Sequence, residues 1–283
     1  MAIKVEDPIR RPTKSAKIVT YRTNAPPSTR IDSLITEEPL EIRAHGPGQD
    51  PVLVATIMRS PGNDFELAVG FLVSEGVITS RSDLATVCYC NLEGLEEQRY
   101  NVVTVALTSP YLSRRNRNMT ISSSCGVCGT SAIDQIELEI APVQTQIKIP
   151  ARVILELPQR LRKRQKLFDA TGGVHGAGIF RLDETVPLVR EDVGRHNAMD
   201  KVIGKSLMDG VLPLYSSVGV LSGRIAFELV QKAGFAGIAV LVSVGAPTSL
   251  AVNLAQRLNI TLCGFVGQDH FNVYTHTDRV VFD

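Results

Sequence analysis

Alternation of apolar and polar residues predicts two pairs of strands in the first half of the chain. Residues 37–46 and 51–60 alternate in this way, and a turn rich in Gly, Pro and Asp separates them. Residues 83–91 and 99–107 predict a second antiparallel pair. The first half is therefore expected to contain a small sheet.

One helix is predicted between these two pairs. Residues 65–76 carry apolar side chains at helical spacing, which places those side chains on one face of the helix. Pro61 and Gly62 end the preceding strand, and Asn63 or Asp64 is the expected N-cap.

The second half alternates continuous apolar strands with amphipathic helices. The predicted helices cover residues 154–168 (a basic one), 195–208, 224–234 and 247–259. The predicted strands cover residues 177–182, 216–221, 237–244 and 260–266. Such a rhythm is typical of a largely parallel sheet with helices on both faces. The fold class is therefore predicted to be α/β.

The chain is expected to have three parts. Residues 1–30 are rich in Pro, Thr, Lys and Arg and predict a loose N-terminal arm. Residues 31–149 form an α+β part, and residues 150–283 form the α/β domain. Residues 109–130 are polar and rich in Ser, Asn and Gly, and long loops of this kind in compact domains are usually functional or mobile.

Composition and charge exclude several classes of protein. Of the 283 residues, 44% are apolar and 21% charged, which excludes a disordered or fibrous chain. No apolar run approaches the roughly 20 residues that span a bilayer, and none follows Arg10 and Arg11 as an export signal requires. We therefore expect a cytoplasmic protein without a membrane segment. The net charge of +1 gives no global field for nucleic acid, so none is expected as a partner.

A local basic cluster is the exception to this balance. It consists of Arg160, Arg162, Lys163, Arg164 and Lys166. A solvated helix face is the favoured interpretation, and contact with a phosphate-bearing ligand or an acidic partner is the alternative.

The cysteines carry the main candidate chemistry. Five cysteines in a reducing compartment do not predict a disulfide framework. Cys88, Cys90 and Cys263 are interpreted as ordinary buried cysteines. Cys125 and Cys128 form a CxxC at the end of the 109–130 loop, just before a helix expected to start at Thr130 or Ser131.

A CxxC has three common meanings, which are half a zinc site, a redox dithiol and a thiolate nucleophile. Zinc needs about four ligands, and the i, i+2 spacing of Cys88 and Cys90 is a poor match, so no metal site is expected. A thioredoxin-like dithiol normally follows a strand and opens a helix, whereas this pair closes a loop. The thiolate fits best, because a following helix and nearby arginines lower the pKa of a thiol.

The zinc deaminases are excluded by their missing catalytic set. They require H-x-E together with P-C-x-x-C. Here Gly176 and Ala177 follow His175, and Ser124 instead of Pro precedes Cys125. Deamination is therefore not expected even if the fold is shared.

Several polar loops are candidates for binding a ligand at the carboxyl ends of the strands. They are a Gly-rich run before a strand, a polar run before a helix, and two loops where a strand leads into a helix. Their candidate residues are His175, Arg195, His196, Ser222, Arg224 and Thr248. A hydroxyl, an arginine and backbone N–H groups suit a phosphate-bearing ligand, although an N-cap role explains each Ser or Thr singly.

These separated motifs together resemble the formate dehydrogenase accessory sulfurtransferases, the FdhD family. The motifs are Pro61 to Leu67, Gly70 to Leu72, Ser74 to Gly76, Cys125 to Gly129, Thr171 to His175, Glu191 to Ala198, Gly264 to Phe265, and Phe271 to Tyr274. They occur in the expected order from about residue 30 to the C-terminus.

The resemblance implies a function and a set of partners. A cysteine desulfurase would supply persulfide sulfur, Cys125 would carry it with Cys128 as companion, and the molybdenum cofactor would accept it. The accepting form is the bis(guanine dinucleotide), with GDP as its mimic, and formate dehydrogenase receives the product. The family also suggests a cytidine-deaminase-like α/β/α layer in the C-terminal half and a homodimer.

The cofactor segment implied by the resemblance is Phe265, Val266, Gly267, Gln268, Asp269 and His270. It contains no Lys or Arg, so Arg195 and Arg224 from other loops would have to neutralise the phosphates. Two rival functions stay open, a cofactor-binding chaperone that moves no sulfur and a zinc-stabilised binding module.

Overall fold

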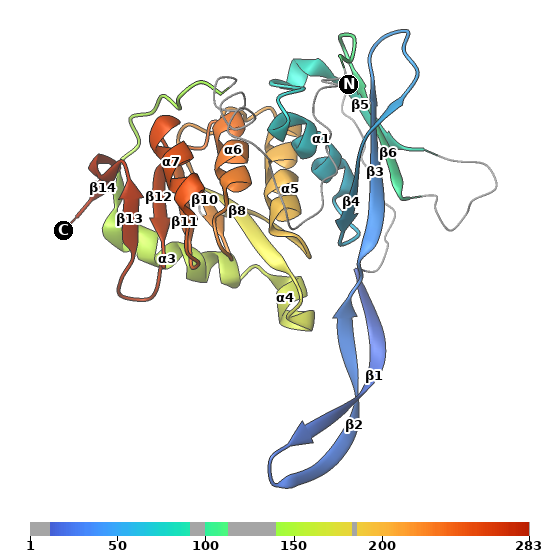
Figure 1. The fold of residues 1–283 in the computed structure, drawn as a ribbon, viewed down its shortest axis with the longest axis vertical. Coiled ribbons are helices and arrows are strands. Elements are labelled where there is room, and N and C mark those ends of the chain that lie inside the picture. Colours follow the sequence, from blue (N-terminus) through green and yellow to red (C-terminus); the bar gives the residue numbers. More distant parts are fainter. Residues whose placement is uncertain (1–11, 91–99, 113–139, 183–185, 283) are drawn as a thin grey trace.

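The computed structural model describes residues 12–90, 100–112, 140–182 and 186–282. Its described part places a small mixed sheet and one helix beside a larger layered α/β unit (Figure 1). This confirms the predicted α/β class.

A two-stranded hairpin replaces most of the loose arm expected for the first 30 residues. Strands β1 (Thr13–Arg22) and β2 (Ala25–Ile35) pair antiparallel from end to end. The expectation of a loose segment was wrong for residues 13–30, because the two strands pair with each other and have no buried face that would give a clear apolar pattern. We call residues 13–35 the arm.

The first half also contains the predicted sheet, with four strands in the order β4-β3-β6-β5. Its strands are β3 (Glu38–His45), β4 (Val52–Arg59), β5 (Leu84–Tyr89) and β6 (Val102–Leu107). Both predicted antiparallel pairs are confirmed, and β3 and β6 join them in parallel. A short 3-10 helix, η1 (Arg81–Asp83), precedes β5.

Helix α1 (Asp64–Ser74) is buried along its whole length, so the predicted single apolar face was wrong. The helix lies between the four-stranded sheet and the helices of the second half (Figure 1). Asn63 is the N-cap, with a left-handed backbone (φ 58°) and no side-chain capping bond. Neighbours on every side explain why polar positions such as Asp64 are also buried.

The second half contains a six-stranded sheet in the order β13-β12-β11-β10-β8-β9. Its strands are β8 (His175–Arg181), β9 (Leu188–Asp192), β10 (Ser217–Leu221), β11 (Val240–Ser243), β12 (Thr261–Gly264) and β13 (Asn272–Thr275). Only β10, β11 and β12 run parallel to one another, and the flanking strands pair antiparallel. The prediction of a largely parallel sheet is therefore correct only for its centre.

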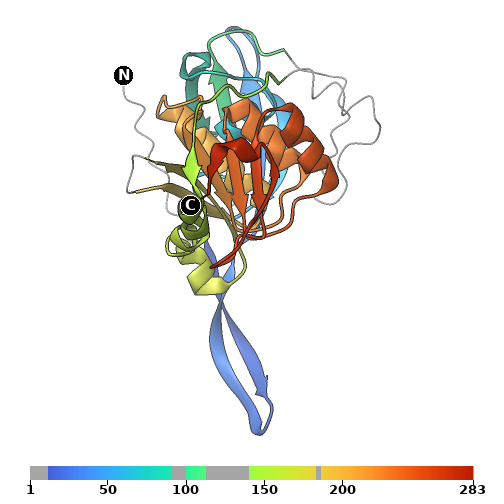
Figure 2. The ribbon, with the colours of Figure 1, turned by 90° about the vertical axis from the view of Figure 1, so that its left-hand side faces the viewer.

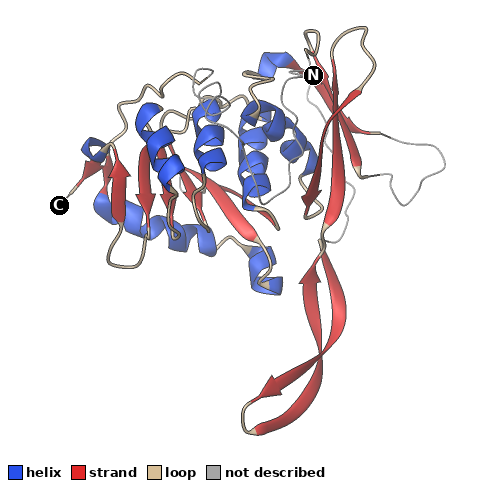
Figure 3. Ribbon diagram, in the orientation of Figure 1, coloured by secondary structure: helices blue, strands red, loops and turns tan. Residues whose placement is uncertain are grey.

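Helices cover both faces of this sheet (Figures 2 and 3). They are α3 (Ala151–Arg162) on one face and α5 (Arg195–Met208), α6 (Phe227–Ala236) and α7 (Ser249–Arg257) on the other. The predicted helix over 154–168 is instead two helices, α3 and α4 (Lys166–Thr171), because the chain turns at 163–165. The short elements β7 (Ile149–Pro150), β14 (Val280–Val281) and η3 (Thr277–Arg279) complete the described fold.

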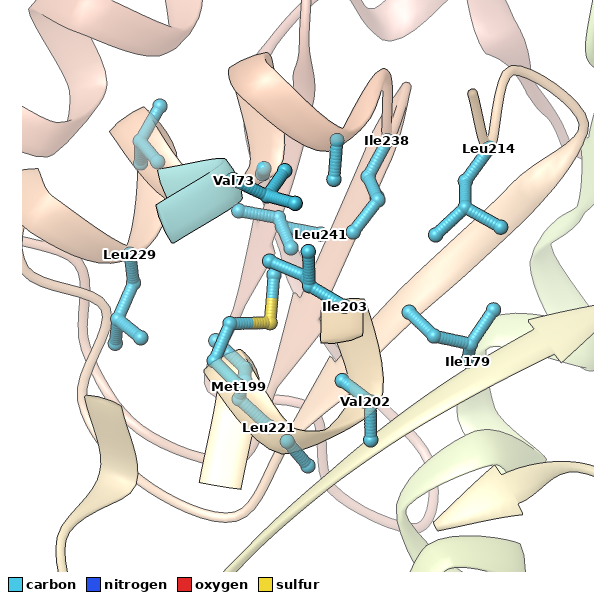
Figure 4. Close-up of a cluster of buried hydrophobic side chains, with 14 of the residues drawn as sticks. Val73, Ile179, Met199, Val202, Ile203, Leu214, Leu221, Leu229, Ile238 and Leu241 are labelled. Carbon is cyan, nitrogen blue, oxygen red and sulfur yellow. The ribbon is translucent and has the colours of Figure 1, made fainter. Parts of the chain in front are cut away.

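One hydrophobic core joins the two halves. Figure 4 shows side chains from α1, α5, α6 and the sheet packed together, including Val73, Ile203, Leu229 and Leu241. All four are at most 1% exposed. The four-stranded sheet and the layered unit therefore fold against each other rather than as separate cores.

Helices α1 and α5 cross at the closest contact in this core. A Cβ atom on Gly70 would lie 1.8 Å from the carbonyl oxygen of Asp200, and one on Gly204 would lie 1.9 Å from that of Glu66. No real Cβ tolerates such distances, so each helix needs glycine where the other passes. The glycines let the two backbones touch, which sets the spacing of the two halves.

Buried charged groups tie the same two helices to their surroundings. Lys232 of α6 contacts both carboxylate oxygens of Asp200 at 2.8 Å, and Ser74 of α1 donates to the same carboxylate at 2.6 Å. Arg190 of β9 pairs with Glu66 of α1. Breaking one partner of a buried pair is costly, since it leaves the other charge uncompensated.

We predict that Gly204→Ala lowers the free energy of unfolding by about 1–3 kcal/mol, the usual cost of overpacking a tight core. The loss exceeds the gain of about 1 kcal/mol that alanine brings to a helix interior. Denaturant-induced unfolding measures it. Lys205→Ala, one residue away on α5, is the control and should change stability little, because that side chain only pairs with Asp209 near the surface. A Gly204→Ala protein as stable as the wild type would contradict the close contact.

Candidate functional site

The three parallel strands end at one edge of the six-stranded sheet, which we call the carboxyl edge. The loops that follow them are residues 222–226, 244–248 and 265–271. Strand β8 starts at this edge, because it runs antiparallel to β10 with Ala177 opposite Leu221. Strand β9 ends there with Asp192 opposite His175. The candidate residues predicted for ligand binding are thus gathered at a single edge.

The loops after β10 and β11 are locked to each other. Ile225 donates its N–H to the carbonyl of Ala246 at 3.1 Å, and Thr248 donates to the carbonyl of Ile225 at 3.0 Å. A Cβ on Gly245 would lie 2.7 Å from the nitrogen of Arg224, so glycine is required where the two loops touch. The sequence did not identify Gly245 as important, because its close contact is with Arg224 in a different loop, about 20 residues away in the chain.

The two candidate hydroxyl groups have structural partners. Ser222 Oγ accepts a hydrogen bond from the N–H of Gly176 at 2.8 Å, joining the β10 loop to β8. Thr248 Oγ1 accepts from the N–H of Ala251 at 3.3 Å and caps α7. The N-cap interpretation therefore describes Thr248, and Ser222 positions the strand that carries His175.

Most of the polar run before α5 is likewise used inside the protein. Asp192 accepts from Gly194, Asn197 and Lys201, and Glu191 accepts from the backbone N–H groups of Leu167 and Phe168. These groups hold the start of α5 in place. Only Arg195 and His196 of this run are left to face a ligand.

Arg195 and His196 each bury a polar atom that has no hydrogen-bond partner among the described residues. These atoms are Arg195 Nε and His196 Nε2. Glu228 Oε2 of α6 lies 4.0 Å from His196 Nε2. Unsatisfied buried polar atoms are rare in native proteins, and each calls for an explanation such as a bound group.

Burial and neighbouring cations act on the two imidazoles of this cluster. Burial first, then Lys232, Arg195 and His175, lower the pKa of His196 to about 3. Burial, followed by Arg195, also lowers the pKa of His175. Both imidazoles are therefore neutral at physiological pH. Sequence reasoning missed Glu228 and Lys232, whose i, i+4 spacing on α6 brings both beside His196.

The loop after β10 contacts His175 and contains Arg224. The imidazole of His175 packs against Gly223, where a Cβ would come within 3.1 Å of its Nδ1. Arg224 is exposed, and its backbone lies next to Gly245. An anion placed along this loop would meet cationic or hydrogen-bonding groups from several elements.

The cofactor segment implied by the resemblance continues the same edge. Phe265 donates to the carbonyl of Gly245 at 3.2 Å, and Val266 donates to that of Ser243 at 3.0 Å. Phe265 is 46% exposed and held in a left-handed backbone conformation, which is uncommon for an aromatic residue. Gly267 packs against His270, whose Nδ1 lies 2.8 Å from Asp269. Gln268 is exposed.

Arg224 and Phe265 both flank Gly245. The cofactor segment has no basic residue of its own, and Arg224 of the neighbouring loop lies close enough to supply one. The structure thus places an exposed aromatic ring and an arginine on one stretch of edge. An aromatic face suits a nucleobase, and an arginine suits a phosphate.

The candidate cysteines Cys125 and Cys128 lie outside the described residues, as do Thr130 and Ser131, so the predictions for this loop stay predictions. Among the other cysteines, Cys88 is exposed, which corrects its interpretation as buried. It lies on the open face of an edge strand, a position that alternation alone did not reveal. Cys90 is partly buried. Cys263 is fully buried, and burial raises the pKa of its thiol to about 12, so it is unreactive.

No metal site is formed by the described residues, since none of their His, Cys, Asp and Glu side chains gather in groups of three. The helices of the described chain also include none that is long and apolar enough to cross a membrane. A cavity of about 270 Å³ lies between residues 61–63, the start of α4 and β9. Of its three basic residues, Arg190 and Lys201 are paired with Glu66 and Asp192, and Arg164 is exposed.

A family model described as the FdhD/NarQ family matches residues 35–281. The chain belongs to this family. A sulfur carrier protein FdhD of Mycolicibacterium paratuberculosis is 44% identical over 273 residues, covering 94% of this chain and 98% of the relative. One of Sulfurisphaera tokodaii is 38% identical and covers 95% of this chain and 99% of the relative.

The fold of this FdhD/NarQ member also has a solved counterpart. A crystal structure of a candidate formate dehydrogenase accessory protein from Desulfotalea psychrophila aligns with a TM-score of 0.74 and 22% identity. It covers 95% of this chain and 100% of that protein, which supports the overall fold.

Proposed function

We propose that this protein is a cytoplasmic sulfur carrier that supplies the molybdenum cofactor of formate dehydrogenase. Its relatives bear the name sulfur carrier protein FdhD over nearly their full lengths. The finer parts of the proposal are what the resemblance of this chain's motifs to the FdhD family implies. They are the donor, the persulfide on Cys125 and the nucleotide-bearing acceptor.

Loading is a thiol exchange that needs no oxidant. The thiolate of Cys125 attacks the outer sulfur of the persulfide on a cysteine desulfurase, and the thiolate of the desulfurase leaves. The outer sulfur keeps its proton and becomes the terminal sulfur of a Cys125 persulfide. The protein acts as a sulfurtransferase in this step.

Unloading moves the terminal sulfur to the acceptor as sulfide, which requires two electrons. The thiol of Cys128 supplies them when it attacks the inner sulfur and forms a disulfide with Cys125. Sulfide is then released to the molybdenum cofactor, and a cellular dithiol reductant restores the two thiols. Cys128 is thus the companion of Cys125 rather than a second carrier.

The observation that carries the acceptor site is a pair of neighbouring buried atoms, Arg195 Nε and His196 Nε2, that have no hydrogen-bond partner in the described part of the chain. A guanine nucleotide fits this chemistry, because a phosphate oxygen accepts hydrogen bonds from both groups and its charge matches Arg195. Arg224, His175 and the Phe265 to His270 segment border the same edge. The dinucleotide of the molybdenum cofactor would lie along it as the bound substrate.

We expect Cys125→Ala to leave formate dehydrogenase inactive when it replaces the native protein in cells that depend on it, because no thiolate remains to accept the sulfur. The matched control is Cys88→Ala, which removes an exposed thiol outside the CxxC and should support full activity. Dehydrogenase activity in extracts is the readout. A fully active Cys125→Ala protein would instead support the cofactor-binding chaperone, which moves no sulfur.

Arg195→Gln is expected to weaken GDP binding about tenfold or more, since a charge-assisted hydrogen bond contributes about 1.5–3 kcal/mol. Titration calorimetry with GDP at two salt concentrations measures the loss and the reduced salt dependence. Arg164→Gln is the control, because that exposed arginine belongs to the basic cluster and lines the cavity beside α4. A loss caused by Arg164→Gln alone would move the nucleotide site to the basic cluster.

A further inference from the structure

Two thiols lie on one face of β5, an edge strand of the four-stranded sheet (Figure 1). Cys88 is exposed and Cys90 is partly buried. Cys90 donates its N–H to the carbonyl of Val102 at 2.9 Å, so it continues the ladder of β5 one residue beyond Tyr89. Because side chains alternate along a strand, Cys88 and Cys90 project from the same face.

The spacing of these two thiols is too wide for a disulfide and suits an ion held between them. Residues two apart in a strand are separated by about 6.6–6.8 Å. A disulfide, in contrast, holds its two Cβ atoms only about 3.5–4.5 Å apart. Two metal–sulfur bonds of about 2.3 Å each span up to about 4.6 Å between the sulfurs, which two side chains reach by leaning toward each other.

The two sulfurs also influence each other electrostatically. Burial, followed by charge repulsion from Cys90, raises the pKa of the Cys88 thiol. The repulsion means that two thiolates at these positions would be close enough to destabilise each other. A cation bound between them removes that repulsion.

A hydroxyl on the neighbouring strand lacks a partner beside this pair. Thr104 of β6 lies directly opposite Cys88 in the register and is 7% exposed. Its Oγ1 is buried and has no hydrogen-bond partner among the residues that the structure describes. Directly opposite side chains have Cβ atoms about 4.5–5.5 Å apart, so the hydroxyl is within reach of the Cys88 sulfur. A neutral thiol is a weak acceptor, whereas hydrogen bonding stabilises a thiolate.

The number and kind of ligands select the ion. Zn²⁺ and similar divalent ions need more ligands than this pair offers, and the described residues contain no group of three. Soft thiolates are the ligands that Cu(I) prefers. Cu(I) is also stable with two thiolates in a line, so Cys88 and Cys90 suffice for it.

We propose that Cys88 and Cys90 bind one Cu(I) ion between them, with the hydroxyl of Thr104 donating to the sulfur of Cys88. Each thiol loses its proton when its sulfur binds the ion, so one Cu⁺ replaces two protons and no electron is transferred. The exposed Cys88 leaves the site open for the ion to enter. This inference concerns a second thiol site and does not depend on the sulfur chemistry proposed above.

The first test is an anaerobic titration of the full-length chain with Cu(I) buffered by bathocuproine disulfonate. Every sample carries Cys125→Ser and Cys128→Ser, because a CxxC also binds soft ions. This background protein is expected to bind one ion per chain, with two sulfur neighbours in its X-ray absorption spectrum. Adding Cys88→Ser or Cys90→Ser should weaken binding by roughly a hundredfold or more, because one of two thiolates is lost. Cys263→Ala is the control and should leave binding unchanged, since that buried thiol belongs to the other sheet.

The second test addresses the hydroxyl. Thr104→Val should weaken Cu(I) binding by about tenfold at unchanged stoichiometry, because it removes one hydrogen bond to a charged sulfur. Thr104→Ser keeps the hydroxyl and should bind like the background protein. An equal loss in both Thr104 variants would contradict the role of the hydroxyl.

Three results would overturn the proposed ion site itself. They are no binding by the background protein, binding that survives Cys88→Ser, and half an ion per chain, which would place the ion between two copies.

Discussion

The contact between the backbones of α1 and α5 is the constraint on which the rest of this structure depends. Gly70 and Gly204 allow it, because any side chain at either position would overlap a carbonyl oxygen of the other helix. Because of this contact, the four-stranded sheet and α1 pack against the layered α/β unit, and the two halves share one hydrophobic core. It also fixes the direction of α5, whose first residue is Arg195.

Around that crossing, buried ion pairs determine which polar groups are free to act. Glu66, Asp192 and Asp200 each hold a cation or a backbone group from another element. These pairs use most of the polar run before α5 to join the halves of the protein. Arg195 and His196 are then left with buried polar atoms directed to no described partner, at the edge where the parallel strands end. Within the polar run before α5, most residues therefore stabilise the fold, and Arg195 and His196 are the candidates for binding a ligand.

The sequence predicted the positions of helices and strands better than it predicted their burial and their packing. Strands β3 to β6 and helix α5 follow from short-range periodicity, and the structure confirms them. The burial of α1 on all sides and the antiparallel flanks of the large sheet depend on contacts between distant segments, which periodicity does not contain. The same limit explains the missed hairpin, since its strands pair with each other and have no buried face to impose a clear apolar pattern.

The candidate site shows the same division. The sequence placed Arg224 at the carboxyl end of a parallel strand, and His175 and Arg195 lie at the same edge because β8 begins there and β9 ends there. Only the structure shows that Thr248 caps α7 and that Ser222 holds β8 in place. In the sequence, a loop hydroxyl that caps a helix looks the same as one that binds a ligand. Gly245, which lies between the arginine and the aromatic residue, was visible only once the loops were placed together.

The central claim is that this chain carries sulfur on Cys125, and intact-mass spectrometry tests it most directly. The wild-type protein is incubated with a cysteine desulfurase and cysteine, and any adduct is located by peptide mapping. The account predicts a reductant-labile gain of sulfur on the peptide that contains Cys125 and Cys128. No gain with a competent desulfurase, or a gain confined to the exposed Cys88, would contradict it.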